Sequence, residues 1–304
     1  MPKFEATLDK LKKLYEKNFK LLRLIPLLIL LLSLGVLGYS KVTTGEFVSK
    51  DISLKGGLII TIETTEFFDI HELETALREA LSEPVFVKRL KIAGSAEQFG
   101  YSFEVEKTTN YEEVLDAIRT YTGLELPDGS YTVEETSASL GGAFWTSTIK
   151  ALLVAFLFMA IVVFYYFRNF VPSSAIVLAA AADLIGTLAI MDLLGIRLST
   201  AGVAALLMLV GYSVDSDILL STKVLKRTEG SFMERVYSAI KTGLTMESTT
   251  LAALAVIYVV SPSSVLKQIA FVLLLGLCLD VINTWFMNVG ILDFYMKYKE
   301  GKNA

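Results

Sequence analysis

Cysteine and histidine are nearly absent from this chain of 304 residues, which has one of each. Cys278 alone cannot form an internal disulfide framework or a cysteine-based metal site. His71 alone cannot form a histidine-rich metal cluster, and its isolation argues against a Ser-His-Asp hydrolase. The motifs GxxxxGK[ST], GxGxxG and HExxH are also missing, which removes the common signatures of nucleotide and zinc enzymes. We therefore expect no enzyme activity, no cofactor and no metal.

The chain also lacks an excess of positive charge. It has 28 Lys and Arg residues against 32 Asp and Glu residues, a net charge of −4. A nucleic-acid-binding domain would be basic, so we expect no nucleic-acid partner. Hydrophobic residues make up 53% and charged residues 20% of the chain, which excludes a disordered protein, a collagen and a coiled coil.

Charge is missing altogether from several long stretches. Leu24–Ser40 and Ala151–Phe167 contain no charged residue. Four further charge-poor runs are Val171–Met191, Leu198–Leu220, Thr242–Val260 and Gln268–Leu292. A membrane-spanning helix needs ~20 mostly apolar residues. The sequence therefore predicts an α-helical polytopic membrane protein with six transmembrane helices, placed in the cytoplasmic membrane and surrounded by the lipid bilayer.

Lys and Arg near the ends of the spans predict the orientation. With the N-terminus in the cytoplasm, 16 of them lie inside, and the two short outside loops hold only Arg197 and Lys267. Both termini should therefore be cytoplasmic. The expected organisation is a cytoplasmic segment (1–20), a first span (21–40), an extracytoplasmic domain (41–145), a five-helix region (146–296) with a cytoplasmic loop at 223–241, and a cytoplasmic tail (297–304).

The N-terminal segment has apolar residues at helical spacing among lysines. They are Phe4, Leu8, Leu11, Tyr15 and Phe19. This pattern suits an amphipathic helix lying on the membrane, and it suits a solvated charged helix equally well.

Segment 41–145 has the pattern of a soluble α+β domain with a net charge of −10. Alternating apolar residues and cap pairs predict strands at 58–63, 85–92, 101–105 and 131–135 and helices at 69–81 and 110–121. The order is β-α-β-β-α-β, which matches the ferredoxin-like unit. We expect this domain to lie between the first and second spans.

Acidic residues inside the spans are the candidate functional residues, because such groups often mark ion or proton paths. Asp183, Asp215, Asp217 and Asp280 are the candidates for an ion or proton relay. No Lys or Arg lies at comparable depth, which favours neutralisation by protonation over a salt bridge. The alternative is that each carboxyl group is inert, either neutral or hydrogen-bonded to a Ser or Thr. Glu247 is expected at a membrane interface.

Two stretches resemble the motifs of the SecD/SecF family, in its SecF branch. Ser53–Gly57 resembles the D-x-x-G-G signature that opens the outside domain, with Ser53 in the place of the aspartate. Gly211–Asp217 resembles the fourth-span motif, and the six-span layout with one large loop matches as well. The family-motif residues are Ser53, Gly56, Gly57, Gly211, Tyr212 and Ser213. The two glycines of the first motif are expected to serve backbone geometry.

This resemblance implies half of a resistance-nodulation-division (RND) type bundle. Proteins of this kind pair with SecD, act beside the Sec translocon channel and draw unfolded polypeptide outward with the ion gradient. Asp215 holds the matching G-x-x-x-D position of the superfamily's relay. Two alternatives remain: a half-size RND exporter of lipids or small molecules, and a structural partner of SecD that conducts no ions.

Overall fold

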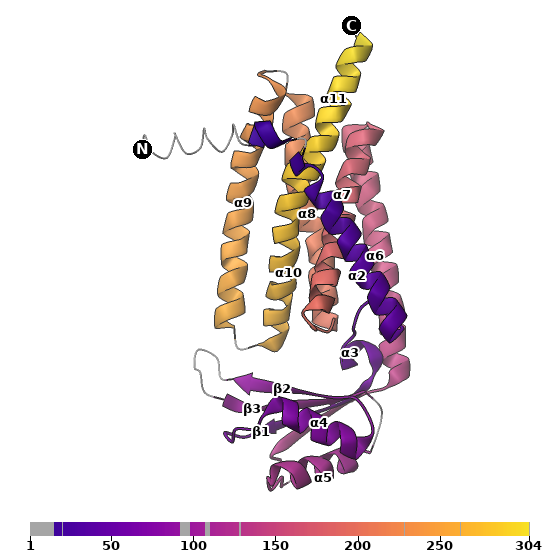
Figure 1. Cartoon of the computed structure of the whole chain (residues 1–304), viewed down its shortest axis with the longest axis vertical. Coiled ribbons are helices and arrows are strands. Elements are labelled where there is room, and N and C mark those ends of the chain that lie inside the picture. Colours follow the sequence, from indigo (N-terminus) through magenta and orange to yellow (C-terminus); the bar gives the residue numbers. More distant parts are fainter. Residues whose placement is uncertain are drawn as a thin grey trace, which may run out of the picture.

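The computed structural model describes residues 15–19, 21–91, 98–106, 110–127, 129–227, 229–261 and 263–303. Of the apolar residues expected to form an amphipathic N-terminal helix, Tyr15 and Phe19 are described, and Phe4, Leu8 and Leu11 lie outside the described residues. The chain forms a long helical bundle with a small sheet at one end (Figure 1).

Within the described residues, six helices are long and apolar enough to cross a membrane, as the charge-poor runs predict. They are α2 (Ile25–Thr44), α6 (Ala138–Phe167), α7 (Phe170–Leu193), α8 (Thr200–Lys226), α9 (Phe232–Val260) and a last helix that contains α10 (Ser264–Ile282). This last helix continues through a π-helical segment, η1 (Asn283–Asn288), into α11 (Val289–Asn303).

The helix ends are set by caps more than by charge. The Ser137 side chain caps α6, so this helix begins eight residues before position 146. The connection expected at 223–241 is mostly helical, because α8 continues to Lys226 and a capping box of Ser231 and Glu234 starts α9. Charged residues on an exposed helix end do not interrupt the helix.

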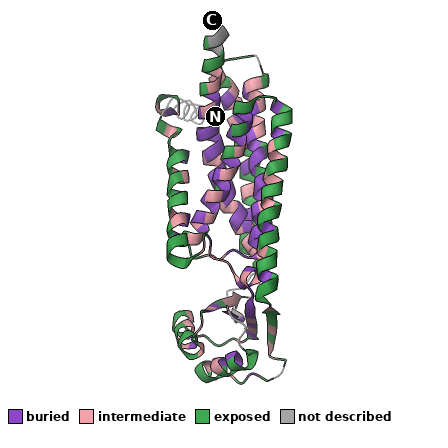
Figure 2. Ribbon diagram, turned by 90° about the vertical axis from the view of Figure 1, so that its right-hand side faces the viewer, coloured by how far each residue is buried: buried purple, intermediate pink, exposed green. Residues whose placement is uncertain are grey.

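Helices α7, α8 and α10 form the centre of the bundle, whereas α2, α6 and α9 are largely exposed (Figure 2). Small residues bring the central helices close together. A Cβ atom at Gly276 would overlap Leu209, and one at Gly186 would lie 2.7 Å from Leu279 Cδ1. These close crossings hold polar side chains of three helices within reach of one another.

The sheet unit lies between α2 and α6 in the sequence. Its elements are β1 (Gly57–Glu63), α4 (Ile70–Leu81), β2 (Val85–Lys91), β3 (Gln98–Val105), α5 (Tyr111–Thr122) and β4 (Tyr131–Thr136). The four strands are antiparallel in the order β2-β3-β1-β4. Asp69 and Asn110 cap the two helices, as their positions in the sequence predict.

The two faces of the sheet have different neighbours, because successive side chains of a strand point to opposite sides. Ile60 and Phe103 lie in the core that the sheet shares with α4 and α5. Glu104, the next residue on β3, is only 4% exposed and pairs with Arg197, which follows α7. The Arg197 guanidinium also lies 3.6 Å above the ring centroid of Phe86 on β2. This contact fixes the sheet against one end of the bundle.

A short helix, α3 (Ile52–Lys55), completes this joint. Just before α3, the Asp51 main-chain N–H donates to the Leu198 carbonyl at 2.9 Å, and the Leu198 N–H donates to the Ser49 carbonyl at 2.8 Å. The chain that leaves α2 is therefore hydrogen-bonded to the α7–α8 connection before it enters β1.

Candidate functional site

Three aspartates meet inside the bundle. Asp183 on α7, Asp217 on α8 and Asp280 on α10 are each fully buried. Asp183 and Asp217 lie at least nine residues from either end of their helices, which is ~13 Å at 1.5 Å per residue. These groups therefore lie deep within the apolar part of the bundle, where an unpartnered carboxylate is costly.

Each carboxyl group is hydrogen-bonded to neutral side chains from another helix. Asp183 accepts from the Ser213 hydroxyl at 2.5 Å and from the Asn283 amide at 2.6 Å. In the part of the chain that the structure describes, no Lys or Arg forms a salt bridge with these aspartates. Hydrogen bonds, rather than salt bridges, hold the site together.

Asp217 and Asp280 share a hydroxyl group. Thr284 Oγ1 lies 2.8 Å from Asp217 Oδ1 and 3.1 Å from Asp280 Oδ1. The Ser216 hydroxyl lies 2.8 Å from Asp280 Oδ2 and 3.0 Å from the main-chain oxygen of Ser213. A hydroxyl has one hydrogen, so two hydroxyl groups cannot donate in four contacts. A protonated carboxyl group would supply a missing hydrogen.

The π-helical segment η1 supplies the remaining partners. Asn283 and Asn288 are one π turn apart and donate to Asp183 and Asp217, the second at 2.6 Å. Thr284 belongs to the same segment. π-helical turns often occur at functional sites, because they rotate side chains relative to an α-helix. The cluster of Asp183, Asp217, Asp280, Ser213, Ser216, Asn283, Thr284 and Asn288 is called the carboxyl network below.

The acidic pattern of the sequence singles out the three aspartates and does not single out Thr284, Asn283 or Asn288. A signal for them is present, because they are the uncharged polar residues that follow Asp280 in an apolar run. Their contacts depend on the π-helical register, which the pattern does not encode.

Glu247 is buried beside the network and lies near the middle of α9, whereas the sequence predicts a place at a membrane interface. Its Oε2 accepts from Trp285 Nε1 at 3.4 Å, and the side chain is 6% exposed. Gly243 leaves room for this contact, because a Cβ atom there would overlap the Trp285 ring. At the other side of η1, the Tyr15 hydroxyl donates to the Trp285 carbonyl at 2.6 Å. Trp285 thus links α9 and the N-terminal segment to the network.

Replacing Gly243 with alanine should displace Trp285 and lower the free energy of unfolding by about 1–3 kcal/mol, the usual range for overpacking. The measurement is thermal unfolding together with Trp285 fluorescence, in a Trp145→Phe background that leaves one tryptophan. Gly38→Ala is the matched control, because its Cβ atom would meet no atom within 4 Å. Equal stability and fluorescence in both variants would contradict the packing argument.

Asp215 does not join the carboxyl network. It is exposed on α8, on the same face as Met208, Gly211 and Tyr212. With Ser216 and Glu247 it lines a small cavity of about 50 Å³ between α8, α9 and α10. Of the fourth-span motif, Ser213 is buried and bonded to Asp183, whereas Gly211 and Tyr212 lie on the exposed face.

The first motif, Ser53–Gly57, lies at the joint between sheet and bundle. Ser53 Oγ accepts from the Thr200 main-chain N–H at 3.1 Å, at the start of α8. Gly56 has φ +89°, and a Cβ atom there would lie 2.5 Å from Ala138 Cα. A Cβ atom at Gly57 would overlap the Val105 carbonyl. Both glycines are therefore needed because another part of the main chain passes too close for a side chain.

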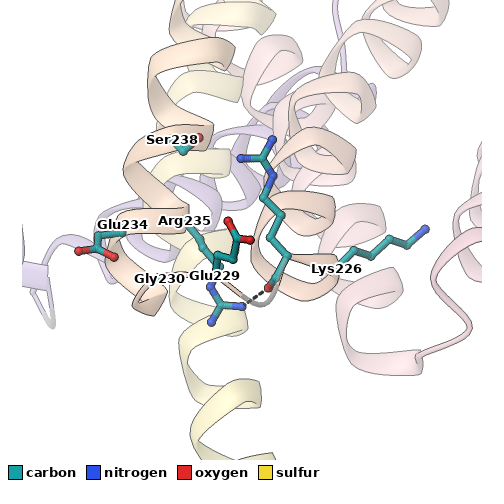
Figure 3. Close-up of a pocket in the computed structure, with 7 residues that line it drawn as sticks. Lys226, Glu229, Gly230, Glu234, Arg235 and Ser238 are labelled. Atoms are coloured by element: carbon teal, nitrogen blue, oxygen red, sulfur yellow. Dashed lines mark hydrogen bonds between the residues drawn. The ribbon is translucent and has the colours of Figure 1, made fainter.

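A wider pocket of about 550 Å³ opens between α8 and α9, at the end of the bundle opposite the sheet. It is lined by Lys226, Arg227, Glu229, Gly230, Glu234, Arg235 and Ser238. Arg235 donates to the main-chain oxygen of Arg227 at 2.7 Å (Figure 3). Since charges of both signs line the pocket, its chemistry favours neither an anion nor a cation.

Comparisons with known proteins identify the family of the chain. The family model described as "Protein export membrane protein SecD/SecF, C-terminal" matches residues 126–298. The chain is 42% identical over 287 residues to a protein of Methanocaldococcus jannaschii named "Protein-export membrane protein SecF", covering 92% of this chain and 96% of the relative. A Pyrococcus furiosus protein of the same name is 37% identical over 99% of this chain and 100% of the relative.

A solved structure shares the fold. The crystal structure of SecDF, a translocon-associated membrane protein from Thermus thermophilus, superposes with a TM-score of 0.71 at 19% identity. It covers 93% of this chain, and this chain spans 38% of that longer one. The family match, the full-length relatives and the six helices lead to one conclusion: the chain belongs to the SecF branch of the SecD/SecF family of protein-export membrane proteins.

Proposed function

We propose that this chain is one half of a membrane complex that works with SecD and uses ion flow to promote export of unfolded polypeptide beside the Sec translocon channel. The observation that carries the proposal is the carboxyl network, in which three buried aspartates are hydrogen-bonded at bilayer depth without a basic partner among the described residues. Buried ionisable groups of this kind are costly to keep and mark ion or proton paths in membrane proteins.

In this proposal Asp280 holds a proton and Thr284 passes it to Asp217. Thr284 Oγ1 contacts both carboxyl groups, and a hydroxyl can accept one proton while it donates another. Asp280 is the better proton holder, because Ser216 can donate to the Ser213 carbonyl and accept from Asp280 at the same time. Asp183 accepts from Ser213 and Asn283 and shares no hydroxyl with the other two aspartates, so it is not part of this step.

The exposed face of α8 is proposed as the contact surface for SecD. Ala204, Met208, Gly211, Tyr212 and Asp215 recur along this face at helical spacing. Asp215 is at least 11 residues, or ~16 Å, from either end of α8, and an exposed carboxyl group at that depth in a bilayer is costly. Gly211 and Ala204 are small enough to let a second helix approach closely. A partner helix on this face would cover Asp215.

The sheet unit is proposed to be a ferredoxin-like domain outside the cell, with both chain termini in the cytoplasm. The antiparallel strand order β2-β3-β1-β4 with two helices on one face supports the fold. The excess of Lys and Arg at the opposite end of the bundle supports the orientation. With this orientation, the sheet would meet polypeptide as it emerges.

Replacing Thr284 with valine tests the relay. Valine keeps the shape of threonine and removes the hydroxyl that joins Asp217 and Asp280. We expect gradient-driven export to fall roughly 100-fold or more, from the low end of the range for a lost proton-transfer group upward. The measurement is export of a secreted reporter into proteoliposomes that contain the chain, its SecD partner and the translocon, with and without an imposed gradient.

Thr187→Val is the matched control. The Thr187 hydroxyl is also fully buried near Asp183, but it donates to a main-chain carbonyl at 2.6 Å. Export should be unchanged in this variant. Full activity of Thr284→Val would argue for the alternative of a structural partner that conducts no ions. Purification with lipid and without a SecD-like chain would instead favour the half-size exporter.

A further inference from the structure

A hollow of about 810 Å³ opens between α6 and α7, in the half of the bundle that lies away from the sheet (Figure 1). The two helices share a core through Val163 and Ile176, and the hollow lies between other faces, which carry Ile161 and Leu178. Ligand pockets in proteins measure roughly 300–1,000 Å³. This hollow, called the α6–α7 groove below, is therefore large enough to hold a ligand.

The length of the groove matches one leaflet of a bilayer. On α7 its lining residues run from Phe170 to Ala181, which is ~16 Å at 1.5 Å per residue. The hydrocarbon core of a bilayer is ~30 Å thick, so one leaflet supplies roughly 15 Å. The groove starts at the two-residue connection between the helices and ends near the middle of the span, which is the depth that an acyl chain of one leaflet reaches.

The interior of the groove suits an apolar guest. Apart from Arg168, it is lined by apolar and aromatic side chains and two serines, and none of the lining residues is acidic. The Ser173 hydroxyl donates to the Asn169 carbonyl at 2.8 Å, and the Ser174 hydroxyl donates to the Val171 carbonyl at 3.0 Å. Because both hydroxyl hydrogens are used within α7, the walls favour a hydrocarbon chain over a polar ligand.

The rim of the groove argues against a partner helix as the occupant. Phe164, Tyr165 and Phe170 are each at least half exposed and line the groove. Helices in membranes approach closely where the contact residues are small. Bulky rings on the rim hold a second helix away, whereas a flexible acyl chain can lie between them.

The mouth of the groove is formed by a residue in an unusual conformation. Arg168 follows α6 with φ +53°, and its main-chain N–H donates to the Phe164 carbonyl at 2.8 Å. Glycine is the usual residue at such a position, because a Cβ atom makes the left-handed conformation costly. Residues held in such conformations cluster at functional sites, including ligand clamps. Arginine at this position therefore points to a role for its side chain.

The charge at the mouth is positive and lacks an acidic partner. Among the described residues, no Asp or Glu forms an ion pair with Arg168. Its guanidinium lies 5.8 Å from the ring centroid of Tyr165. Lys226 Nζ, 3.5 Å from the ring centroid of Tyr166, adds a second positive charge at this end of α6. A guanidinium with several N–H donors binds phosphate well.

We propose that the α6–α7 groove binds a membrane phospholipid with an anionic headgroup. The phosphate pairs with Arg168, and an acyl chain lies along the groove against Phe164 and Leu178. This lipid site goes beyond the proposed export function and is independent of the carboxyl network. The proposed orientation enters only in naming the leaflet, which is the cytoplasmic one.

The test is made on the purified full-length chain in detergent, by native mass spectrometry with equal concentrations of dioleoylphosphatidylglycerol and dioleoylphosphatidylcholine. The chain should retain the anionic lipid in preference to the zwitterionic one. Excess glycerol 3-phosphate, which has the headgroup chemistry without acyl chains, should not displace it. Equal retention of the two lipids, or displacement by glycerol 3-phosphate, would overturn the proposal.

Arg168→Gly tests the headgroup contact. Glycine is preferred at this φ, so the variant should fold, and thermal unfolding checks that it does. The preference for the anionic lipid should fall about fivefold, the effect of one basic residue near an anionic lipid surface. Arg227→Gly is the matched control, because Arg227 is an exposed residue at the end of α8 that does not line the groove. An unaltered preference in Arg168→Gly, or an equal loss in both variants, would contradict the site.

Ala181→Leu tests the acyl-chain contact by filling the deep end of the groove. Retention of both lipids should weaken roughly fivefold or more, the low end of the effect of overpacking. Ala253→Leu is the matched control, since Ala253 is exposed on α9 and does not line the groove. Lipid retention that is unchanged in Ala181→Leu would place the lipid elsewhere and overturn the assignment.

The same measurement on the complex with its SecD partner separates a lipid from a protein occupant. The preference for the anionic lipid, and its dependence on Arg168, should persist in the complex. If the partner abolished both, the α6–α7 groove would be a protein interface, and the lipid site would be overturned.

Discussion

Replacing Asp280 with asparagine is expected to reduce export to the level seen without an ion gradient. Asparagine has the shape of a protonated aspartate, and its amide can donate to Ser216 or Thr284 as the acid would. It cannot release a proton, so the relay would stop while the fold remains. The free energy of unfolding should change by about 1 kcal/mol or less, because no buried group loses its partner.

The measurement pairs the reconstituted export assay with thermal unfolding of the same preparation. Asp293→Asn is the matched control, since Asp293 lies further along the same continuous helix and pairs with Lys297 at 2.7 Å, away from the carboxyl network. That variant should keep gradient-driven export. If Asp280→Asn retained gradient-dependent export, the carboxyl network would not be the relay. If it unfolded instead, the hydrogen-bond account of Asp280 would fail.

The apolar runs and cap residues allow most of the architecture to be predicted. A run such as Ala151–Phe167 has few alternatives to a membrane helix, because its main-chain groups must bond within the segment. The strands and helices of the sheet unit also follow from local features. Asp69 and Asn110 each accept main-chain hydrogen bonds at the start of a helix, and this geometry needs no distant residue.

It is harder to predict which membrane carboxyl groups point toward the centre of the bundle. Asp215 and Asp217 are two residues apart, so on a helix they point in nearly opposite directions and one at most can face the centre. The sequence motif favours Asp215, whereas Asp217 is the residue that is buried against Thr284 and Asn288. The choice is made by packing of α8 against α10, and such long-range contacts leave no local pattern.

Glu247 is a second residue whose surroundings depend on long-range packing and cannot be predicted from the local sequence. Its place near the start of an apolar run suggests an interface, yet it is buried, because Gly243 on the same helix admits the Trp285 ring. The Glu104–Arg197 pair likewise joins residues 93 positions apart. Neither partner stands out in the sequence, and a charged residue on one face of a strand normally indicates solvent.

Replacing Gly56 with alanine should open the joint between the sheet and the bundle. Gly56 has φ +89° and ψ 159°, a region that is essentially restricted to glycine, and the new Cβ atom would meet the Ala138 backbone at 2.5 Å. Because the obstacle is backbone, it cannot move aside as a side-chain end can. We expect a loss of about 3–5 kcal/mol in the free energy of unfolding from backbone strain and overlap together.

Gly123→Ala isolates the cost of the backbone conformation. Gly123 also has a positive φ, +69°, as the cap of α5, but a Cβ atom there would meet nothing within 4 Å. It should cost about 1–2 kcal/mol, the usual penalty for a left-handed residue with a side chain. Thermal unfolding and limited proteolysis near residue 56 measure the difference. If the two variants lost the same stability, contact with α6 would not explain Gly56, and the sheet would not need this joint to keep its orientation above the carboxyl network.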